Sequence, residues 1–252
     1  MSFSVSAEAY GRFMGRFSEP LADSFVDLLN PQRGSTALDV GCGPGALTGR
    51  LVAALGDEAV TAVDPMPEFL EALRSRWPGV RALRGSAEEL PLADDVVDLA
   101  VAQLVVHFMK DPVAGLGEMR RVTRPAGTVA ATVWDLAGDT SPLSDFWAGA
   151  VAVDPTVTTE AWMPGARAGH LAALFDQAGF ADARTTTLTV TVSFSSFEEW
   201  WEPFTFGVGP AGAYVASLDE PGQERLRESC RTHLPDAPFQ VTGQAWTVVA
   251  RA

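Results

Sequence analysis

Leu38-Asp39-Val40-Gly41-Cys42-Gly43-Pro44-Gly45-Ala46-Leu47-Thr48 is the stretch that decides the fold. A short apolar run ends in three glycines spaced by two, and an apolar segment follows. This order predicts a strand, a tight turn and a helix, because glycine takes left-handed backbone torsions at little cost. The free N–H groups that open the next helix then face a ligand above the turn. We therefore expect a nucleotide-type binding turn after the first strand of an open parallel sheet.

The glycine turn by itself admits three interpretations. It can join a strand to a helix without binding a ligand. Gly41-x-Gly43-x-x-Ala46 also satisfies the loose dinucleotide fingerprint, whose last position accepts alanine. The acidic Asp39 just before the turn favours a third interpretation, since a carboxylate repels a pyrophosphate but attracts the ammonium group of an amino-acid ligand.

Composition limits the partners and the compartment. The chain of 252 residues carries 18 basic and 32 acidic residues, a net charge of −14, so we expect no nucleic-acid partner. Cys42 and Cys230 offer neither a disulfide framework nor zinc-ligand spacing, which predicts a cytoplasmic protein without a metal. Met1 to Gly15 lacks the basic and apolar segments of a signal peptide. No uncharged apolar stretch has the length of a membrane span, so membrane insertion is not expected.

A helical leader precedes the glycine turn. Between residues 7 and 29 apolar side chains recur every three or four positions, which predicts helix, and Pro20 is expected to split it in two. Tyr10 and Arg16 lie among the aromatic residues of this leader. Packing on the core accounts for the phenylalanines, but a leader helix can also fold over a ligand. We expect Arg16 to pair with a ligand carboxylate and Tyr10 to reach the substrate pocket.

Asp64 is the second strong feature of the sequence. It ends the predicted second strand, about twenty residues after the glycines. A carboxylate at this place accepts hydrogen bonds from both ribose hydroxyls of a bound nucleoside, in NAD and in S-adenosylmethionine (SAM) alike. The alternative is a cap for the helix expected to start near Pro67. Together with the glycine turn, Asp64 favours ribose binding.

Several further segments follow in a fixed order and cover about residues 36–135. They are Leu-Asp-Val-Gly-Cys-Gly-Pro-Gly at 38–45, Asp64, Gly-Ser-Ala-Glu-Glu-Leu-Pro at 85–91, the predicted strand-four exit from Gln103 to Met109, and Arg-Pro-Ala-Gly at 124–127. The chain thereby resembles the class I SAM-dependent methyltransferases, in particular the methyltransferase type 11 family related to ubiquinone and menaquinone biosynthesis. An NAD-binding protein would require none of the segments after Asp64. The family often carries Asp where this chain has Ser86, and Ser86-x-x-Glu89 alternatively fits a helix capping box.

The resemblance implies a fold, an activity and a set of cofactor contacts. The implied fold is an α/β, Rossmann-like, doubly wound mixed sheet of seven strands, with an antiparallel last strand. The implied activity is methyl transfer from SAM, which leaves S-adenosylhomocysteine (SAH), to a small-molecule acceptor. A SAM- or SAH-binding protein without turnover is the alternative, and an NAD-dependent oxidoreductase is a weaker one. The cofactor contacts are expected at Arg16, Asp39, Gly41, Cys42, Gly43, Asp64, Pro65, Met66, Ser86, Ala87 and Gln103.

The domain plan is one methyltransferase domain over residues 1–252. It comprises a leader at 1–33, a SAM-binding core at 34–135 and a cap insertion at 195–238, between the last two strands. Five aromatic residues fall within 197–206. Such a stripe is typical of packing, but over a cofactor crevice it can also form a lid for a small apolar acceptor.

The acceptor side is predicted from topology. Residues that leave the fourth strand enter the crevice beside the methyl donor, which makes His107 the candidate general base. We expect the acceptor pocket to include Tyr10, His107, Trp200 and Trp201. The alternative is that the histidine is a satisfied structural residue and that the tryptophans pack in the cap.

Overall fold

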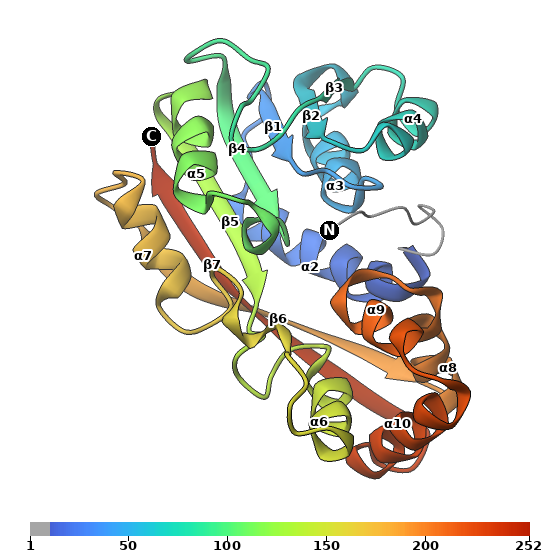
Figure 1. Ribbon diagram of the computed structural model, residues 1–252. Helices are drawn as coiled ribbons and strands as arrows, with labels where there is room; N and C mark the ends of the chain where they lie inside the picture. The colour runs from blue at the N-terminus through green and yellow to red at the C-terminus, as the bar shows by residue number, and fades with distance from the viewer. Residues whose placement is uncertain (1–10) are drawn as a thin grey trace.

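One mixed sheet of seven strands organises the computed structural model, which describes residues 11–252. The strand order is β3-β2-β1-β4-β5-β7-β6 (Figure 1). The neighbours from β3 to β5 run parallel, whereas β7 is antiparallel to both β5 and β6. The predicted mixed sheet with its antiparallel last strand is thus confirmed. The strands are β1 (Ala37–Val40), β2 (Val60–Asp64), β3 (Arg81–Arg84), β4 (Val97–Gln103), β5 (Thr123–Trp134), β6 (Arg184–Phe194) and β7 (Phe239–Arg251).

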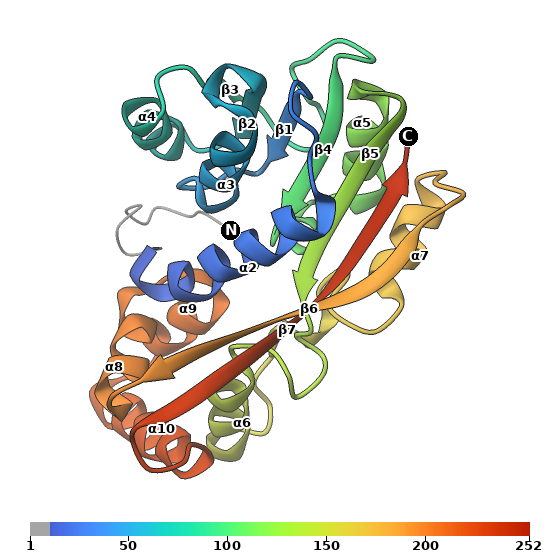
Figure 2. The same cartoon turned by 180° about the vertical axis from the view of Figure 1, so that it is seen from behind.

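Helices cover both faces of this sheet and the far end of its last two strands (Figures 1 and 2). The α-helices are α2 (Arg16–Leu29), α3 (Ala46–Leu55), α4 (Pro67–Arg76), α5 (Pro112–Val122), α6 (Ser144–Val153), α7 (His170–Gln177), α8 (Phe197–Trp201), α9 (Gly209–Ser217) and α10 (Glu220–His233). A π-helical turn, η1 (Gly11–Gly15), precedes α2, and the 3₁₀ turns are η2 (Asp57–Ala59), η3 (Val106–Phe108), η4 (Glu160–Trp162) and η5 (Glu202–Phe206).

Two apolar layers follow from strand alternation, since successive side chains point to opposite faces. On one face Leu38, Ala100 and Val129 pack with α5 and α7. On the other, Ala37 and Val101 pack with α2, α3 and α4. The strands of the parallel part are buried on both faces. Their sequences are therefore nearly continuous apolar runs. The sheet is therefore doubly wound.

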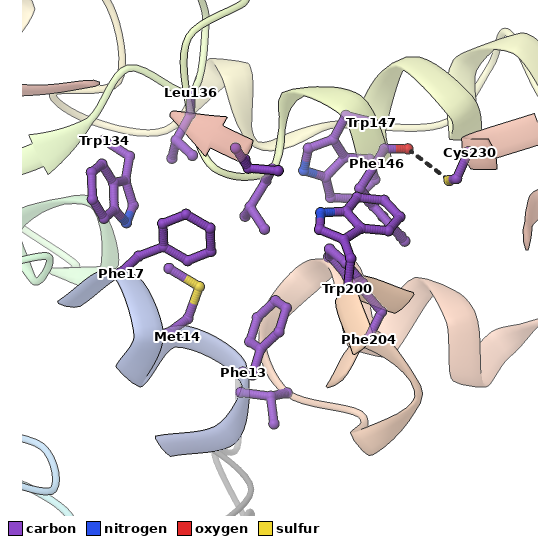
Figure 3. Close-up of a cluster of buried hydrophobic side chains, with 14 of the residues drawn as sticks. Phe13, Met14, Phe17, Trp134, Leu136, Phe146, Trp147, Trp200, Phe204 and Cys230 are labelled. Carbon is purple, nitrogen blue, oxygen red and sulfur yellow. Dashed lines mark hydrogen bonds between the residues drawn. The ribbon is translucent and has the colours of Figure 1, made fainter. Parts of the chain in front are cut away.

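The last two strands carry the chain beyond the rest of the sheet. β7 pairs with β5 only from Ala245 to Arg251, whereas it pairs with β6 from Phe239 to Val249. The segment between β6 and β7, called the cap here (residues 195–238), contains α8, η5, α9 and α10 and packs with α6 around the free end of the hairpin (Figures 1 and 2). Its apolar core is shared with η1 and α2 of the leader (Figure 3).

The expected break at Pro20 is wrong. α2 continues through Pro20 to Leu29, although proline removes one backbone donor from the helix. Leu21, Ala22 and Phe25, which follow the proline, are completely buried. Burial of this apolar face outweighs the lost hydrogen bond, because tertiary packing contributes most of the stability of a helix in a folded protein.

Candidate cofactor and acceptor site

The glycine turn has the backbone that its sequence requires. Gly41, Gly43 and Gly45 have φ of 68°, 51° and 97°, the left-handed region that side chains disfavour. A Cβ at Gly41 would lie 2.6 Å from the methyl groups of Val105, and one at Gly45 would lie 2.7 Å from the Trp77 ring. The turn therefore places backbone without side chains at the carboxyl end of β1, next to β4.

Asp64 ties this turn to the end of β2. Its Oδ2 accepts a hydrogen bond of 2.9 Å from Gly43 N, and its Oδ1 accepts one of 2.8 Å from Met66 N. The helix α4 begins at Pro67 with Met66 as its N-cap residue and no side-chain cap, so the alternative role of Asp64 as a helix cap is wrong. Burial raises the pKa of Asp64, while the two backbone donors act in the opposite direction. The carboxylate is thus held in one orientation above the crevice.

Asp39 is a buried carboxyl group within the same site. Its side chain is 1% exposed, and Thr48 Oγ1 donates a hydrogen bond of 2.6 Å to its Oδ2. Burial, opposed by that hydrogen bond and reinforced by the nearby Asp64, raises the pKa of Asp39 to about 7. A cationic ligand group would stabilise its ionised form.

A cavity lies beside the glycine turn, and two of the residues that line it have buried polar atoms without hydrogen-bond partners in residues 11–252. It is lined by Ser18 from α2, by Asp39 and the turn, and by Gln103 and Leu104 from β4. The buried Oγ of Ser18 and Oε1 of Gln103 have no hydrogen-bond partner within residues 11–252, although Gln103 Nε2 donates to Ser18 O at 2.9 Å. Buried polar atoms cost free energy unless they are paired, so these atoms fit a ligand with polar groups of its own.

The loop after β3 forms a turn and not a helix. Ser86 pairs with Glu89 in an isolated bridge, and Glu89 N donates to Ser86 O. No helix begins between residues 85 and 105, so the capping-box alternative for Ser86 is wrong. Ala87 packs on the apolar layer under α5. The loop starts next to β2, where Gly85 N donates to Asp64 O.

Leu104 lies between the cavity at the glycine turn and a second cavity. It follows β4 and has φ of 59°, an uncommon backbone for a side chain other than glycine, asparagine or aspartate. It lines the cavity at the glycine turn and also a second cavity under the cap. Strained backbone gathers at functional sites. No pattern in the sequence indicated this residue.

The second cavity is mostly apolar and has few polar groups. Leu104 and His107 line it from the β4 exit, Phe13 and Met14 from η1, and Val208 to Ala211 from the cap. Figure 3 shows Phe13 and Met14 of the leader facing Leu136 and Trp134 across this region. The polar side chains on its wall are His107, Glu160 and the indole of Trp134.

His107 lies where topology predicted, in η3 after β4. It is 7% exposed, and its ring forms no hydrogen bond within the described part of the chain. Burial lowers the pKa of His107 to about 3. The imidazole is therefore neutral at physiological pH and accepts a proton poorly, which disfavours the general-base role that the sequence suggested.

Glu160 is the residue that sequence reasoning missed. It lies in η4, is 4% exposed, and accepts a hydrogen bond of 2.9 Å from Trp147 Nε1 on its Oε2. Burial raises the pKa of Glu160 to about 7. The sequence around it, Thr-Thr-Glu-Ala-Trp, has no spacing that links it to the site. Only the fold brings this segment to the cavity wall.

Trp200 and Trp201 do not line the cavity beside His107, which corrects the predicted acceptor pocket. Both are buried, at 3% and 7% exposed. Trp200 packs on Phe204, with 4.8 Å between ring centroids, and Phe204 stacks on Phe146 at 4.5 Å (Figure 3). Burial of large rings against one another holds the cap together. Residues 208–211 of the cap reach the cavity in their place.

Arg16 also lies elsewhere than expected. Its Nη1 forms an ion pair of 2.6 Å with Glu199 Oε1 of the cap, and its guanidinium lies over the ring of Phe194. It does not line the cavity at the glycine turn. The acidic partner on α8 holds the side chain toward the cap, and the contact with a ligand carboxylate stays a prediction. Tyr10, the other leader residue, lies outside the described residues.

The family model for a methyltransferase domain matches residues 38–131. The match contains the glycine turn, Asp64, the Ser86 loop and the exit of β4. Residues 38–131 thus resemble the methyltransferase domain family. The polar groups at the carboxyl ends of β1, β2 and β4 lie within or directly after strands of this matched segment.

Relatives of known sequence match part of this chain. An uncharacterized methyltransferase of Mycobacterium tuberculosis is 42% identical over 135 residues, which make up 54% of this chain and 52% of that protein. The malonyl-[acyl-carrier protein] O-methyltransferase of Pectobacterium atrosepticum is 36% identical over 165 residues, 63% of this chain and 62% of that protein. The chain thus spans about half to three fifths of the length of the relatives that it matches.

Solved structures share the fold over most of this chain. The YcgJ protein of Bacillus subtilis superposes with a TM-score of 0.58 at 16% identity and covers 93% of this chain and 97% of that one. The [4+2]-cyclase SpnF has a TM-score of 0.55 at 18% identity and covers 92% of this chain and 80% of that one. At these identities the likeness shows a Rossmann-like fold alone.

Two negative findings apply to the described part of the chain. Within residues 11–252 no group of three or more His, Cys, Asp and Glu side chains is placed to hold a metal ion. Over the same range no helix combines the length and apolar character needed to cross a membrane.

Proposed function

We propose that the chain transfers a methyl group from SAM to a small-molecule acceptor bound under the cap, in the cytoplasm. The observation that supports this proposal is that Leu104 lines both cavities. Methyl transfer requires the donor and the acceptor to meet at one point. The polar cavity at the glycine turn lies on one side of Leu104, and the apolar cavity under the cap lies on the other.

The donor side fits SAM by its chemistry. Asp64 offers a carboxylate to the ribose hydroxyls, and Asp39 offers one to the ammonium group. The unpaired Ser18 Oγ and Gln103 Oε1 offer two further polar contacts to the amino-acid part. The loop at Ser86 and Ala87 would border the adenine, as the family resemblance implies. Cys42, Pro65 and Met66 complete the proposed contacts.

The protein's own task is alignment and exclusion of water. SAM supplies a methyl group that its sulfonium already activates. The left-handed Leu104 and the apolar side chains of η1 and the cap would hold the acceptor in line and dry. His107, neutral and unpaired, would orient a polar group of the acceptor.

Ligand binding tests this proposal directly. Melting curves and calorimetry with SAH, adenosine and NAD are expected to show binding of SAH and none of NAD. Binding at one hundred times the dissociation constant adds about 2.7 kcal/mol to the free energy of unfolding, which a melting curve detects easily. Binding of NAD in place of SAH would contradict the proposal. Because one structural neighbour is a [4+2]-cyclase, transfer of a labelled methyl group from SAM to an acceptor is the second, independent measurement.

A further inference from the structure

The apolar cavity under the cap contains a buried carboxyl group without a cationic partner. Glu160 Oε2 accepts the Trp147 indole N–H, and Glu160 Oε1 has no hydrogen-bond partner within residues 11–252. Among residues 11–252, no arginine or lysine lines the cavity. A buried carboxylate is costly unless it is paired with a cation and hydrogen-bonded. Because Glu160 lines the cavity, its unpaired oxygen is a place for a positively charged hydrogen-bond donor.

The other groups on the wall agree with a cationic occupant. Phe13, Phe108 and Trp134 contribute aromatic rings to the cavity, and the faces of such rings attract cations. His107 is neutral because burial lowers the pKa of its ring, so it adds no positive charge that would repel a cation. The chain as a whole carries a net charge of −14, which favours the approach of cations.

We propose that the acceptor is a small, mostly apolar amine, whose ammonium group binds Glu160 Oε1 while its apolar part fills the cavity under the cap. For transfer, the ammonium nitrogen would give one proton to the Glu160 carboxylate. The freed lone pair would then take the methyl group as the carbon–sulfur bond of SAM breaks, which leaves SAH and the methylated amine. This inference rests on the proposed function and specifies the substrate class of the same site. Glu160 would be the residue that sets the specificity for an amine over an alcohol of the same shape. A carboxylate acceptor would meet repulsion from Glu160 at this place.

A matched pair of probes tests the proposal without requiring turnover. 2-Phenylethylamine and 2-phenylethanol have nearly the same shape, and the amine is an ammonium ion at neutral pH. Their affinities for the full chain loaded with SAH can be measured by NMR titration at 0.15 M salt, which screens the surface charges. We expect the amine to bind at least tenfold tighter than the alcohol, as a hydrogen bond to a charged partner predicts.

Glu160→Gln identifies the residue responsible. The glutamine oxygen can still accept the Trp147 N–H, whereas the side-chain charge is gone. We expect this variant to lose at least tenfold in affinity for the amine and less than threefold for the alcohol. Glu202→Gln is the control, because Glu202 is exposed and pairs with Arg12 on the surface of the cap. It should change neither affinity by more than twofold.

A second measurement keeps the test valid should Glu160→Gln fail to fold. In the wild-type chain the Trp147 indole N–H resonance reports on its partner Glu160, so the amine should shift this resonance more than the alcohol does. The proposal is overturned if the alcohol binds as tightly as the amine, if neither binds, or if the amine leaves the Trp147 resonance unchanged. SAH binding to the same samples separates the outcomes. Loss of the amine preference with intact SAH binding overturns only this inference, whereas failure of SAH to bind overturns the proposed function.

Discussion

At the residue scale, Asp64 has a structural role, and we propose that it also binds the ribose. Its two oxygens already accept N–H groups from Gly43 and Met66. A carboxylate held in this way is preorganised, and each oxygen keeps a lone pair for a ribose hydroxyl. The sequence position alone predicted the binding role, because an acidic residue at the end of the second strand is a property of nucleotide-binding sheets.

Removal of this side chain gives the first prediction. Asp64→Ala should weaken SAH binding by about 1.5–3 kcal/mol, since hydrogen bonds to charged groups contribute that much. This corresponds to roughly tenfold to a hundredfold in the dissociation constant, measured by calorimetry. Asp57→Ala is the matched control, because Asp57 likewise accepts backbone N–H groups, from Glu58 and Gly79, in a turn that does not line the site. An unchanged SAH affinity in folded Asp64→Ala protein would refute the ribose contact.

The second prediction concerns Asp39 and the pH dependence of SAH binding. The folded-state pKa of about 7 lies above the unfolded value, so the protonated form stabilises the fold at low pH and this contribution is lost as pH rises from about 4 through 7. A bound ammonium group favours the ionised form. SAH binding at pH 6 should therefore release up to about one proton, and affinity should rise toward pH 8. Calorimetry in two buffers of different ionisation enthalpy measures the proton. Equal proton release by Asp39→Asn would exclude Asp39 as its source.

At the scale of elements, exposed ion pairs join η1 and α2 to the cap. Arg12 pairs with Glu202 and Arg16 with Glu199. The spacing of apolar side chains in the leader correctly predicted a helix. It could not indicate that the arginines face the cap, because their acidic partners lie more than 180 residues further along the chain.

Arg16→Ala distinguishes an ion pair with the cap from a contact with the ligand carboxylate. If Arg16 serves the cap, the variant should lose no more than about 1 kcal/mol of unfolding free energy, as exposed ion pairs do. Its affinity for SAH should then stay within about twofold of the wild type, with no change relative to adenosine, which lacks the carboxylate. A loss of SAH affinity of tenfold or more, with adenosine unaffected, would restore the contact with the ligand carboxylate.

The aromatic stripe of α8 and η5 is a packing element. Trp200→Ala removes a side chain that is 3% exposed and contacts several rings, so we expect the free energy of unfolding to fall by about 3–5 kcal/mol. Denaturant unfolding monitored by circular dichroism measures the loss. Glu202→Ala, an exposed change in the same segment, should cost less than about 1 kcal/mol. A loss below about 1 kcal/mol for Trp200→Ala would show that the ring is not part of the core.

At the scale of the whole molecule, the parallel half was predictable and the acceptor side was not. The sequence signals of the parallel half are local. The glycine turn, Asp64 and the later segments each lie at or close to one end of a strand. The acceptor cavity is assembled from η1, the β4 exit, η4 and the cap, which are distant in sequence. Glu160 and Leu104 depend on this assembly, so no local pattern marks them. The two tryptophans were misplaced for the same reason, because composition shows that a segment is apolar but not which neighbour it packs against.

The claim on which the account depends is that SAM binds between the ends of β1, β2 and β4. A crystal structure of the chain with SAH tests it most directly. We predict electron density in the cavity beside the glycine turn, with the ribose hydroxyls within hydrogen-bond distance of Asp64, the ammonium group toward Asp39, and the sulfur on the side of Leu104. SAH bound elsewhere on the protein, or bound in this cavity with its ribose away from Asp64, would contradict the account.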